Sequence, residues 1–284
     1  MFSKYVTIDG VAVNYFHTGA STLPGTPPAL DQGELLLFAH GAGSNAHTWH
    51  RQLAHVAAAH SGVALDFPGH GRSGSTEGLP DLAAHVRCVA AFADQVARRP
   101  VVFVGRALGG AVGLGFAAAH PERLRALVLV ATPARFAIPP ASLDTWHAVT
   151  MGRATQPFDM RLFAPGADMA VVRECFMEQV KTDPRVRYTD LLAGNGLDFT
   201  AQLGALRVPT LVITGRHDHF CPPDKAEDVQ RAIPGAQLAV IENAGHMLTS
   251  EQPDAFNAAV DAFLATLPPI PSPAPAGEGQ GGGY

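Results

Sequence analysis

The sequence predicts an α/β protein in which a mostly parallel central sheet is flanked by helices. Apolar runs alternate with helical stretches along most of the chain, a pattern typical of parallel strands joined by helical crossovers. Leu124–Val130 is a nearly unbroken apolar run, as expected of a strand buried on both faces of such a sheet. Asp9 and Gly10 lie between the runs Tyr5–Ile8 and Val11–Phe16, which predicts an initial hairpin.

The remaining elements follow from short apolar runs, which indicate strands, and from longer alanine-rich runs, which indicate helices. After the hairpin, strands are expected at Glu34–Ala39, Val63–Leu65, Val101–Val104, Leu124–Val130, Leu211–Ile213 and Leu238–Ile241, and helices at Leu79–Arg98 and Gly109–His120. The proline-rich segment 22–32 is expected to be a surface loop.

The most informative motif follows the strand predicted at Val101–Val104. Residues 105–109 read G-R-A-L-G and lead into a helical stretch. A strand, turn and helix carrying G-x-S-x-G form a nucleophile elbow, because the glycines let the backbone bend and direct the central residue into a cleft. The central residue here is Ala107, which has no hydroxyl, thiol or carboxylate. Covalent catalysis through this position is therefore excluded in this chain.

An acid and a histidine follow the elbow in the sequence. Asp218 comes at the carboxyl end of the predicted strand that begins at Leu211, and His246 lies in the loop after Leu238–Ile241. The order elbow, acid, histidine is that of serine hydrolases with a nucleophile elbow, and it differs from the orders of the two main serine protease folds.

Five motifs occur in a characteristic order. They are H-G-A-G at 40–43, D-F-P-G-H-G-R-S-G at 66–74, G-R-A-L-G at 105–109, G-R-H-D at 215–218 and A-G-H-M at 244–247. On these motifs the chain resembles the lidded α/β-hydrolase superfamily, of the serine esterase type, over about its first 265 residues. The resemblance assigns the nucleophile position to Ala107, the acid to Asp218 and the base to His246. It also implies an oxyanion hole formed by the backbone N–H groups of Ala42 and Leu108.

The resemblance further implies how the chain is organised. The α/β core is expected at 1–132 and 203–266, and a helical lid at 133–202, where the alternation of strands and helices breaks down. The segment 267–284, rich in proline and then glycine, is expected to be a disordered tail.

The lid and the site loops supply candidate substrate contacts. These are Trp49, Arg106, Trp146, Met151, Phe158 and Met247, and they suggest a small hydrophobic ester or related acyl substrate. Arg106 beside the elbow is expected to form a structural ion pair, with a contact to an acidic substrate group as the alternative. Ser44 and Ser73 lie in site-forming loops, but neither occupies an elbow.

Composition excludes several function classes. The formal net charge of −5 and the lack of a Lys/Arg-rich stretch argue against a nucleic-acid partner. No secretory signal or membrane span is recognised, so a cytoplasmic location is expected. Cys88, Cys175 and Cys221 are expected to be reduced thiols. His47 and His50 lack further ligands, so no metal site is expected. No cofactor is implied, and the sequence does not indicate an oligomeric state.

Three interpretations of Ala107 remain open at this point. In the first, alanine replaces the serine of an ester, thioester or lactone hydrolase that works through an acyl-enzyme, and this form is inactive; carbon–carbon bond hydrolysis is also within reach of such a triad. In the second, Asp218 and His246 act without a nucleophile as a base dyad in cofactor-independent lyase or oxygenase chemistry. In the third, the chain is a noncatalytic binding protein that keeps the pocket.

Overall fold

The computed structural model describes residues 2–20, 22–23 and 25–269. The strands are β1 (Phe2–Ile8), β2 (Val11–His17), β3 (Leu35–Ala39), β4 (Ser61–Leu65), β5 (Val101–Arg106), β6 (Leu124–Val130), β7 (Thr210–Gly215) and β8 (Gln237–Ile241). The α-helices are α1 (His50–Val56), α2 (Leu82–Phe92), α3 (Leu108–Ala119), α4 (Pro140–Thr150), α5 (Met169–Gln179), α6 (Pro184–Gly194), α7 (Pro223–Ala232), α8 (Leu248–Glu251) and α9 (Pro253–Leu264). Single turns are η1 (Ala46–Trp49), η2 (Ala93–Ala97), η3 (Pro121–Arg123), η4 (Met160–Leu162) and η5 (Leu203–Ala205).

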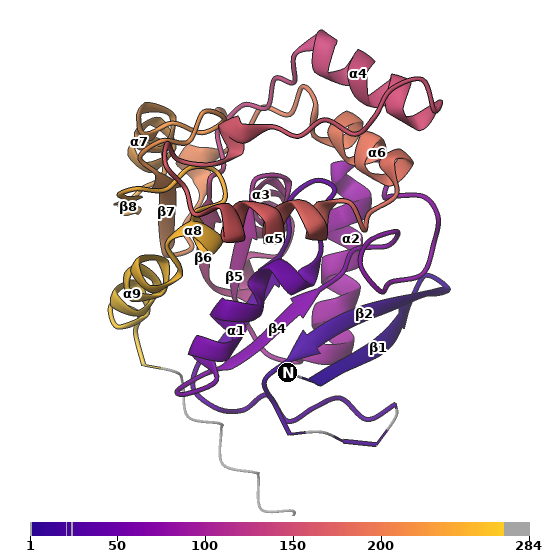
Figure 1. Cartoon of the computed structure of the whole chain (residues 1–284). Coiled ribbons are helices and arrows are strands. Elements are labelled where there is room, and N and C mark those ends of the chain that lie inside the picture. Colours follow the sequence, from indigo (N-terminus) through magenta and orange to yellow (C-terminus); the bar gives the residue numbers. More distant parts are fainter. Residues whose placement is uncertain (1, 21, 24, 270–284) are drawn as a thin grey trace, which may run out of the picture.

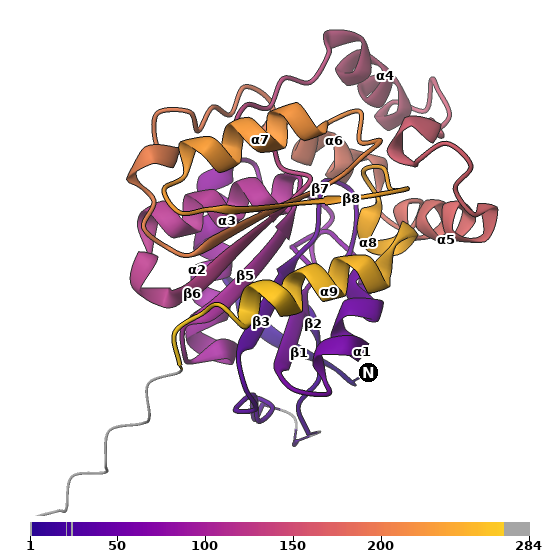
Figure 2. The same ribbon diagram turned by 90° about the vertical axis from the view of Figure 1, so that its left-hand side faces the viewer.

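The strands of the described chain form one sheet in the order β1-β2-β4-β3-β5-β6-β7-β8. The hairpin β1–β2 is antiparallel and pairs antiparallel with β4, whereas the strands from β3 to β8 run parallel. Figure 2 shows α2, α3 and α7 on one face of the sheet and α1 and α9 on the other. The predicted α/β architecture is confirmed.

Each face of the sheet has its own apolar core because side chains alternate along a strand. In β3, Leu35 and Leu37 pack toward α2 and α3, while Leu36 and Phe38 pack toward α1 and α9. β3, β4 and β5 are buried along their whole length. This two-faced burial explains why the central strands read as continuous apolar runs.

The predicted helix at 79–98 is shorter in the structure. Asp81 caps the amino end of α2, where its side chain accepts a hydrogen bond from Ala84 N at 2.7 Å. α2 ends at Phe92, and the chain continues through η2 to Arg98, which has a left-handed backbone conformation. Local capping therefore sets the helix boundaries within a segment whose composition is uniformly helical.

The insertion between β6 and β7 carries α4, α5 and α6 and lies over the carboxyl ends of the parallel strands (Figure 1). Its two ends pair with each other, because Phe136 N donates to Leu197 O and Phe199 N donates to Ala134 O. A small apolar cluster of Phe163, Val172, Cys175 and Met247 packs α5 against the core loop before α8. The expected tail lies mostly at 270–284, outside the described residues.

Candidate active site

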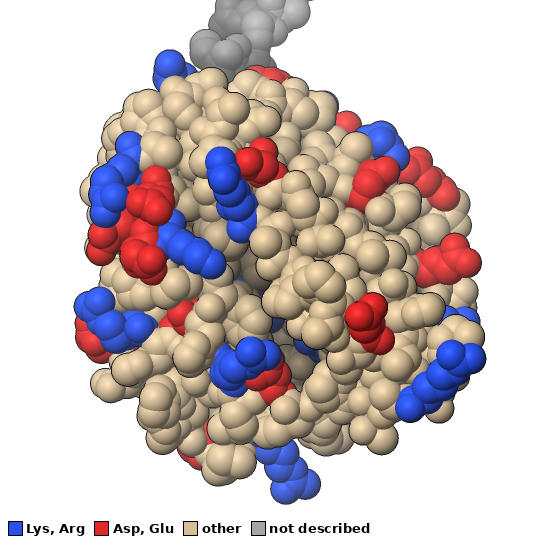
Figure 3. Space-filling model, turned by 90° about the horizontal axis from the view of Figure 1, so that it is seen from above, with Lys and Arg blue, Asp and Glu red and all other residues tan. Residues whose placement is uncertain are grey.

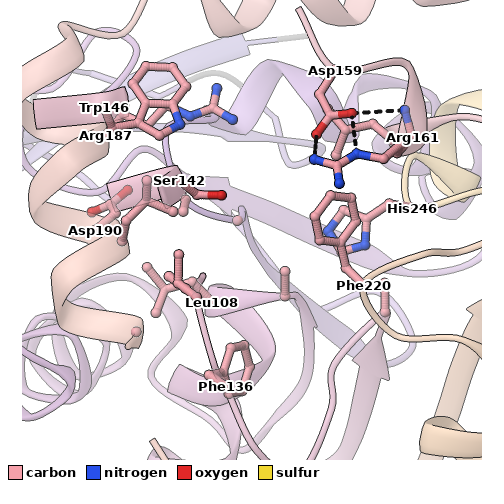
Figure 4. Close-up of a pocket in the computed structure, with 18 of the residues that line it drawn as sticks. Leu108, Phe136, Ser142, Trp146, Asp159, Arg161, Arg187, Asp190, Phe220 and His246 are labelled. Carbon is pink, nitrogen blue, oxygen red and sulfur yellow. Dashed lines mark hydrogen bonds and ion pairs between the residues drawn. The ribbon is translucent and has the colours of Figure 1, made fainter. Parts of the chain in front are cut away.

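The loops that follow β3, β5, β7 and β8 meet beneath the insertion and line a cavity of about 660 Å³. In parallel sheets all strands present their carboxyl ends at one edge, so residues distant in sequence converge there. Ala107, His246, Ala42 and Leu108 line the cavity, and Figure 4 shows Leu108 and His246 among the lining side chains. Figure 3 shows the cavity as a hollow on the face seen from above.

Ala107 has the backbone geometry of an elbow although it lacks the elbow's usual side chain. Its φ of 50° and ψ of −113° lie in a region that costs a non-glycine residue about 1–3 kcal/mol. The flanking glycines allow this turn. A Cβ at Gly105 would clash with Gly109 O, and a Cβ at Gly109 would lie 2.6 Å from His40 O. The strained turn therefore presents residue 107 to the cavity at the start of α3.

Asp218 lies at the end of β7 and holds the imidazole of His246. Its Oδ2 is 2.9 Å from His246 Nδ1, and its Oδ1 accepts backbone N–H bonds from Phe220 at 2.7 Å and Cys221 at 3.0 Å. Burial of Asp218 acts to raise the pKa of its carboxyl, but the attraction of His246 and these hydrogen bonds bring that pKa below its ordinary value. The carboxylate is ionised and leaves His246 Nε2 free to act as a base.

Ala42 and Leu108, whose backbone N–H groups the resemblance assigns to an oxyanion hole, both line the cavity. Leu108 is the first residue of α3, and Ala42 lies in the loop after β3. Neither N–H donates a hydrogen bond to any acceptor in the described ranges. A Cβ on Gly41 would lie 3.6 Å from Ala107 Cβ, so this loop lies directly beside the elbow. Two donors of this kind are suited to stabilising an oxyanion.

Buried polar side chains fix the loop after β3. Phe67 N donates to His40 Nε2 at 3.1 Å, so Nδ1 carries the proton and donates to Gly41 O at 2.9 Å. Burial lowers the pKa of His40 to about 3, which keeps the ring neutral. Asp66 accepts from Ala46 N at 2.7 Å and from Arg72 N at 2.9 Å. The H-G-A-G and D-F-P-G-H-G-R-S-G motifs thus brace each other.

A second buried cluster ties the insertion to the core. Asp190 on α6 accepts from Gly43 N at 2.8 Å and from His70 Nε2 at 2.8 Å. Both side chains are buried, with 1% and 0% of their surface exposed. His70 belongs to the loop after β4, so this ion pair joins α6 to two core loops at the edge of the cavity.

Four of the six predicted substrate contacts line the cavity: Arg106, Trp146, Phe158 and Met247. The prediction for Trp49 was wrong, because its side chain is 1% exposed and packs against Phe38 and Phe256 on the α1–α9 face of the sheet. The prediction for Met151 was also wrong. Met151 follows α4, is 55% exposed, and does not line the cavity.

The expected ion pair of Arg106 is absent from the described part of the chain. The Arg106 side chain is buried, and its guanidinium donates to Met247 Sδ at 3.0 Å and Ser44 Oγ at 3.3 Å. No carboxylate oxygen of the described residues lies within 4 Å of it, although the cavity reaches it. Ser44 Oγ therefore accepts a hydrogen bond from Arg106. Ser73 Oγ donates to Asp66 O at 2.7 Å.

Other features near the cavity carried no clear signal in the sequence. Phe220 packs edge-on against His246, with ring centroids 5.1 Å apart, and follows the acid by two residues, which is the one local clue to its position. Gln179, Arg187 and Asp190 come from α5 and α6 and reach the site only through tertiary packing. The three cysteines are buried free thiols, and Cys221 supports Asp218 through its backbone.

Two further observations concern other ligands. Within the described ranges no group of three or more His, Cys, Asp or Glu side chains could hold a metal ion, and the rings of His47 and His50 stack on each other. None of the described helices combines the length and the apolarity needed to cross a membrane.

Comparison with known proteins gives consistent matches. A family model described as "Alpha/beta hydrolase family" matches residues 36–259. The acetyltransferase component of an acetoin cleaving system from Cupriavidus necator is 28% identical over 274 residues, which cover 92% of this chain and 68% of that relative. The chain thus spans about two thirds of that relative's length.

Two further matches extend over nearly the whole length of the other protein. A pimeloyl-[acyl-carrier protein] methyl ester esterase from Neisseria meningitidis is 28% identical, over 79% of this chain and 90% of the relative. The crystal structure of a hydrolase from Pseudomonas aeruginosa PA01 superposes with a TM-score of 0.77 at 28% identity, over 92% of this chain and 98% of the other.

Proposed function

Because this chain belongs to the alpha/beta hydrolase family, we propose that its cavity is a carboxylic ester hydrolase site in which alanine occupies the nucleophile position. The observation that carries the proposal is the strained backbone of Ala107, which is retained beside a complete Asp218–His246 pair and two free N–H donors. A strained backbone of this kind is the one that places a nucleophilic side chain on that Cβ between the base and the N–H donors.

The mechanism of the serine form follows from the geometry. His246 removes the proton of the hydroxyl at position 107, the oxygen attacks the ester carbonyl, and the N–H groups of Ala42 and Leu108 stabilise the oxyanion. His246 then protonates the leaving alcohol. Water, activated by the same imidazole, releases the acid from the acyl-enzyme. Asp218 keeps the imidazole in the required tautomer and stabilises its charged form.

The name of the Neisseria relative supports ester chemistry, and apolar side chains of the insertion line the cavity entrance. In this chain the substrate is expected to bind without being turned over, because removing the nucleophile of a serine hydrolase costs about a millionfold in kcat. Thioesters, lactones and carbon–carbon bonds accessible to the same triad belong to the substrate panel. No cofactor takes part in the proposed steps.

The experiment is the Ala107→Ser exchange, with both proteins assayed on short and medium p-nitrophenyl esters, thioesters and lactones. Turnover only in the serine form, abolished by an added His246→Ala exchange, is the expected result. Inactivity of both proteins on the whole panel would contradict the proposal.

A second candidate function is favoured by one observation: the Asp218–His246 pair is complete without a nucleophile. Such a dyad can remove a proton from an acidic substrate, as lyase or cofactor-independent oxygenase chemistry requires. Under this alternative the alanine form itself is active and loses its activity on His246→Ala. Ligand binding without reaction in either the alanine or the serine form would instead indicate a binding protein.

A further inference from the structure

Two guanidinium groups line the cavity with no carboxylate of the described residues within ion-pair distance; Arg106 is buried and Arg187 is partly buried. Arg106, at the end of β5, is 4% exposed and is held only by neutral atoms, Met247 Sδ and Ser44 Oγ. An arginine is charged at any physiological pH, and burying that charge is costly unless an anion compensates it. No carboxylate of the described residues lies within ion-pair distance of Arg106, although Asp218 attracts it from farther away.

Arg187 on α6 packs against the same loop after β3 as Arg106, whose Nε would lie 3.8 Å from a Cβ at Gly41. Its aliphatic stem packs so closely on Gly43 that a Cβ there would lie 2.6 Å from Arg187 Cδ. The guanidinium lies over the Trp146 ring, 4.4 Å from the centroid, and Nη1 donates to Gln179 Oε1 at 3.0 Å. Its buried Nε has no hydrogen-bond partner among the described residues. Figure 4 shows Arg187 with Trp146 on one side of the cavity and His246 with Phe220 on the other.

The side chains that line the cavity carry more positive than negative charge. Its lining includes five cationic side chains, Arg106, Arg135, Arg161, Arg187 and Lys225, but only two acidic ones, Asp159 and Asp190. Both acids are already paired, Asp159 with Arg161 and Asp190 with His70. Of the cations, Arg135 pairs with Asp198 outside the lining, which leaves Arg106, Arg187 and Lys225 without an ion pair among the described residues. Blue atoms of Lys and Arg are visible inside the hollow in Figure 3. The cavity is thus cationic in a protein whose formal net charge is −5.

Burial is the main cause of a lowered pKa in both arginines. Asp218 attracts Arg106 from beyond ion-pair distance, and Arg187, whose pKa is lowered to about 10, is attracted by Asp190 and Asp159 but repelled by Arg106. A bound anion would offset the cost of burying the charges of Arg106 and Arg187. Planar guanidinium groups bind carboxylates through paired, charge-assisted hydrogen bonds.

We propose that Arg106 and Arg187 form a carboxylate-binding subsite, so that the substrate is an ester that also carries a free carboxylate. This inference rests on the proposed ester hydrolase function and specifies its substrate class. The apolar lining then contacts the carbon chain between the ester and the carboxylate. The small hydrophobic ester expected from the sequence becomes an amphiphilic one, with its charged end held on the Arg106–Arg187 side.

The test compares matched esters in the Ala107→Ser protein. p-Nitrophenyl hydrogen adipate carries a carboxylate on the acyl side, and p-nitrophenyl hexanoate is its neutral counterpart. A second pair, 4-carboxyphenyl hexanoate and phenyl hexanoate, places the carboxylate on the alcohol side. The subsite predicts a higher kcat/KM for the charged member of at least one pair, and that pair identifies the side of the ester from which the carboxylate comes.

Variants of Arg187 connect the preference to the subsite. Arg187→Gln keeps hydrogen-bonding capacity but removes the charge, and is expected to lower the charged-to-neutral kcat/KM ratio by about 30-fold or more. Arg187→Lys keeps the charge and is expected to retain most of the ratio. Arg173→Gln, an exposed arginine on α5 that does not line the cavity, is the matched control and should leave the ratio unchanged.

A binding measurement separates this inference from the ester hydrolase proposal. Calorimetry on the unaltered Ala107 chain, which does not depend on turnover, compares monomethyl adipate with methyl hexanoate. Tighter binding of monomethyl adipate, lost in Arg187→Gln, supports the subsite even if the serine form is inactive on every ester; in that case only the hydrolase function fails. Equal or tighter binding of methyl hexanoate overturns the subsite. An equal loss of kcat/KM on both esters of a pair in Arg187→Gln also overturns it.

Discussion

Asp218 Oδ2 lies 2.9 Å from His246 Nδ1 while Asp218 Oδ1 is occupied by two backbone N–H groups. The carboxylate therefore accepts hydrogen bonds at both oxygens and requires a proton on Nδ1 of the imidazole. This fixes the tautomer in which Nε2 is unprotonated. The pair is organised for proton abstraction in a chain that has no hydroxyl at position 107.

Asp218→Asn in the Ala107→Ser background tests this arrangement. An amide at position 218 that donates to Nδ1 favours the wrong tautomer, and the same exchange in a serine protease lowers kcat by about 10⁴-fold. We expect a loss of that order in kcat with KM little changed, measured by steady-state kinetics on a p-nitrophenyl ester. A variant that retained nearly full activity would show that Asp218 does not orient the base.

Ala107→Gly tests whether the elbow is strained. Glycine tolerates a φ of 50°, whereas alanine in this conformation costs about 1–3 kcal/mol. Part of that gain is offset because glycine makes the unfolded chain more flexible. We expect the free energy of unfolding to rise by up to about 1 kcal/mol, measured by urea denaturation.

Ala258→Gly is the matched control, because Ala258 is exposed in the middle of α9. Glycine in a helix interior is expected to lower the free energy of unfolding by about 1 kcal/mol. A similar destabilisation at both positions would mean that Ala107 is not strained.

The His70–Asp190 pair predicts a pH-dependent anchor for α6. Burial acts to lower the pKa of His70 and to raise that of Asp190, but their attraction outweighs burial, so the His70 pKa is raised and the Asp190 pKa is lowered. The contribution of His70 is lost as pH rises through its raised pKa. That of Asp190 is lost as pH falls through its lowered pKa. The pair therefore stabilises the fold most between the ordinary values, 3.8 and 6.5.

Asp190→Asn is expected to lower the free energy of unfolding by about 3 kcal/mol near pH 5.5 and by less at pH 8.5. The neighbouring His85 lies 3.8 Å from Asp190, and burial lowers the pKa of its imidazole. The residue at position 85 is the same in both proteins that are compared. Asp198→Asn breaks an exposed pair with Arg135 and should change the free energy of unfolding little at either pH. Denaturation curves of the variants at the two pH values measure these losses. A loss in Asp190→Asn that is independent of pH would contradict the pH-dependent contribution of the His70–Asp190 pair.

Trp146 and Met151 test the position of the substrate. Trp146 is 7% exposed and lines the cavity, whereas Met151 is 55% exposed and lies outside it. In the Ala107→Ser background, Trp146→Leu is expected to lower kcat/KM by about tenfold through lost apolar contact. Met151→Leu should have no effect. Equal effects of the two exchanges, with thermal melts confirming that both variants fold, would place the substrate elsewhere.

The sequence predicted the features that depend on local pattern. The continuous apolar run Leu124–Val130 was recognisable as a buried strand because both of its faces are covered. Residues 105–109 predicted the turn because its glycines are required by close backbone contacts. The boundaries of α2 were missed because Asp81 caps its amino end after the predicted start, and the α-helix gives way to η2 after Phe92 although the sequence there still reads as helical.

Features that depend on long-range packing were not predictable in the same way. Trp49 follows a site loop, but its ring turns to the far face of the sheet, and an aromatic residue gives no signal of which face it will join. The free guanidinium of Arg106 and its proximity to Arg187 arise only when the insertion folds over the elbow. An ion pair was expected for Arg106 from its position beside the elbow, but its guanidinium lines the cavity and donates to Met247 Sδ and Ser44 Oγ.

The most direct test of the central claim is covalent labelling of the Ala107→Ser protein with a fluorophosphonate, which reacts with a serine activated by a base and an oxyanion hole. Intact-protein mass spectrometry and peptide mapping are expected to find one label at position 107, absent from the unaltered chain and lost when His246→Ala is added. An unlabelled Ala107→Ser protein, or labelling that persists without His246, would contradict the account of this cavity as a serine hydrolase site that lacks only its nucleophile.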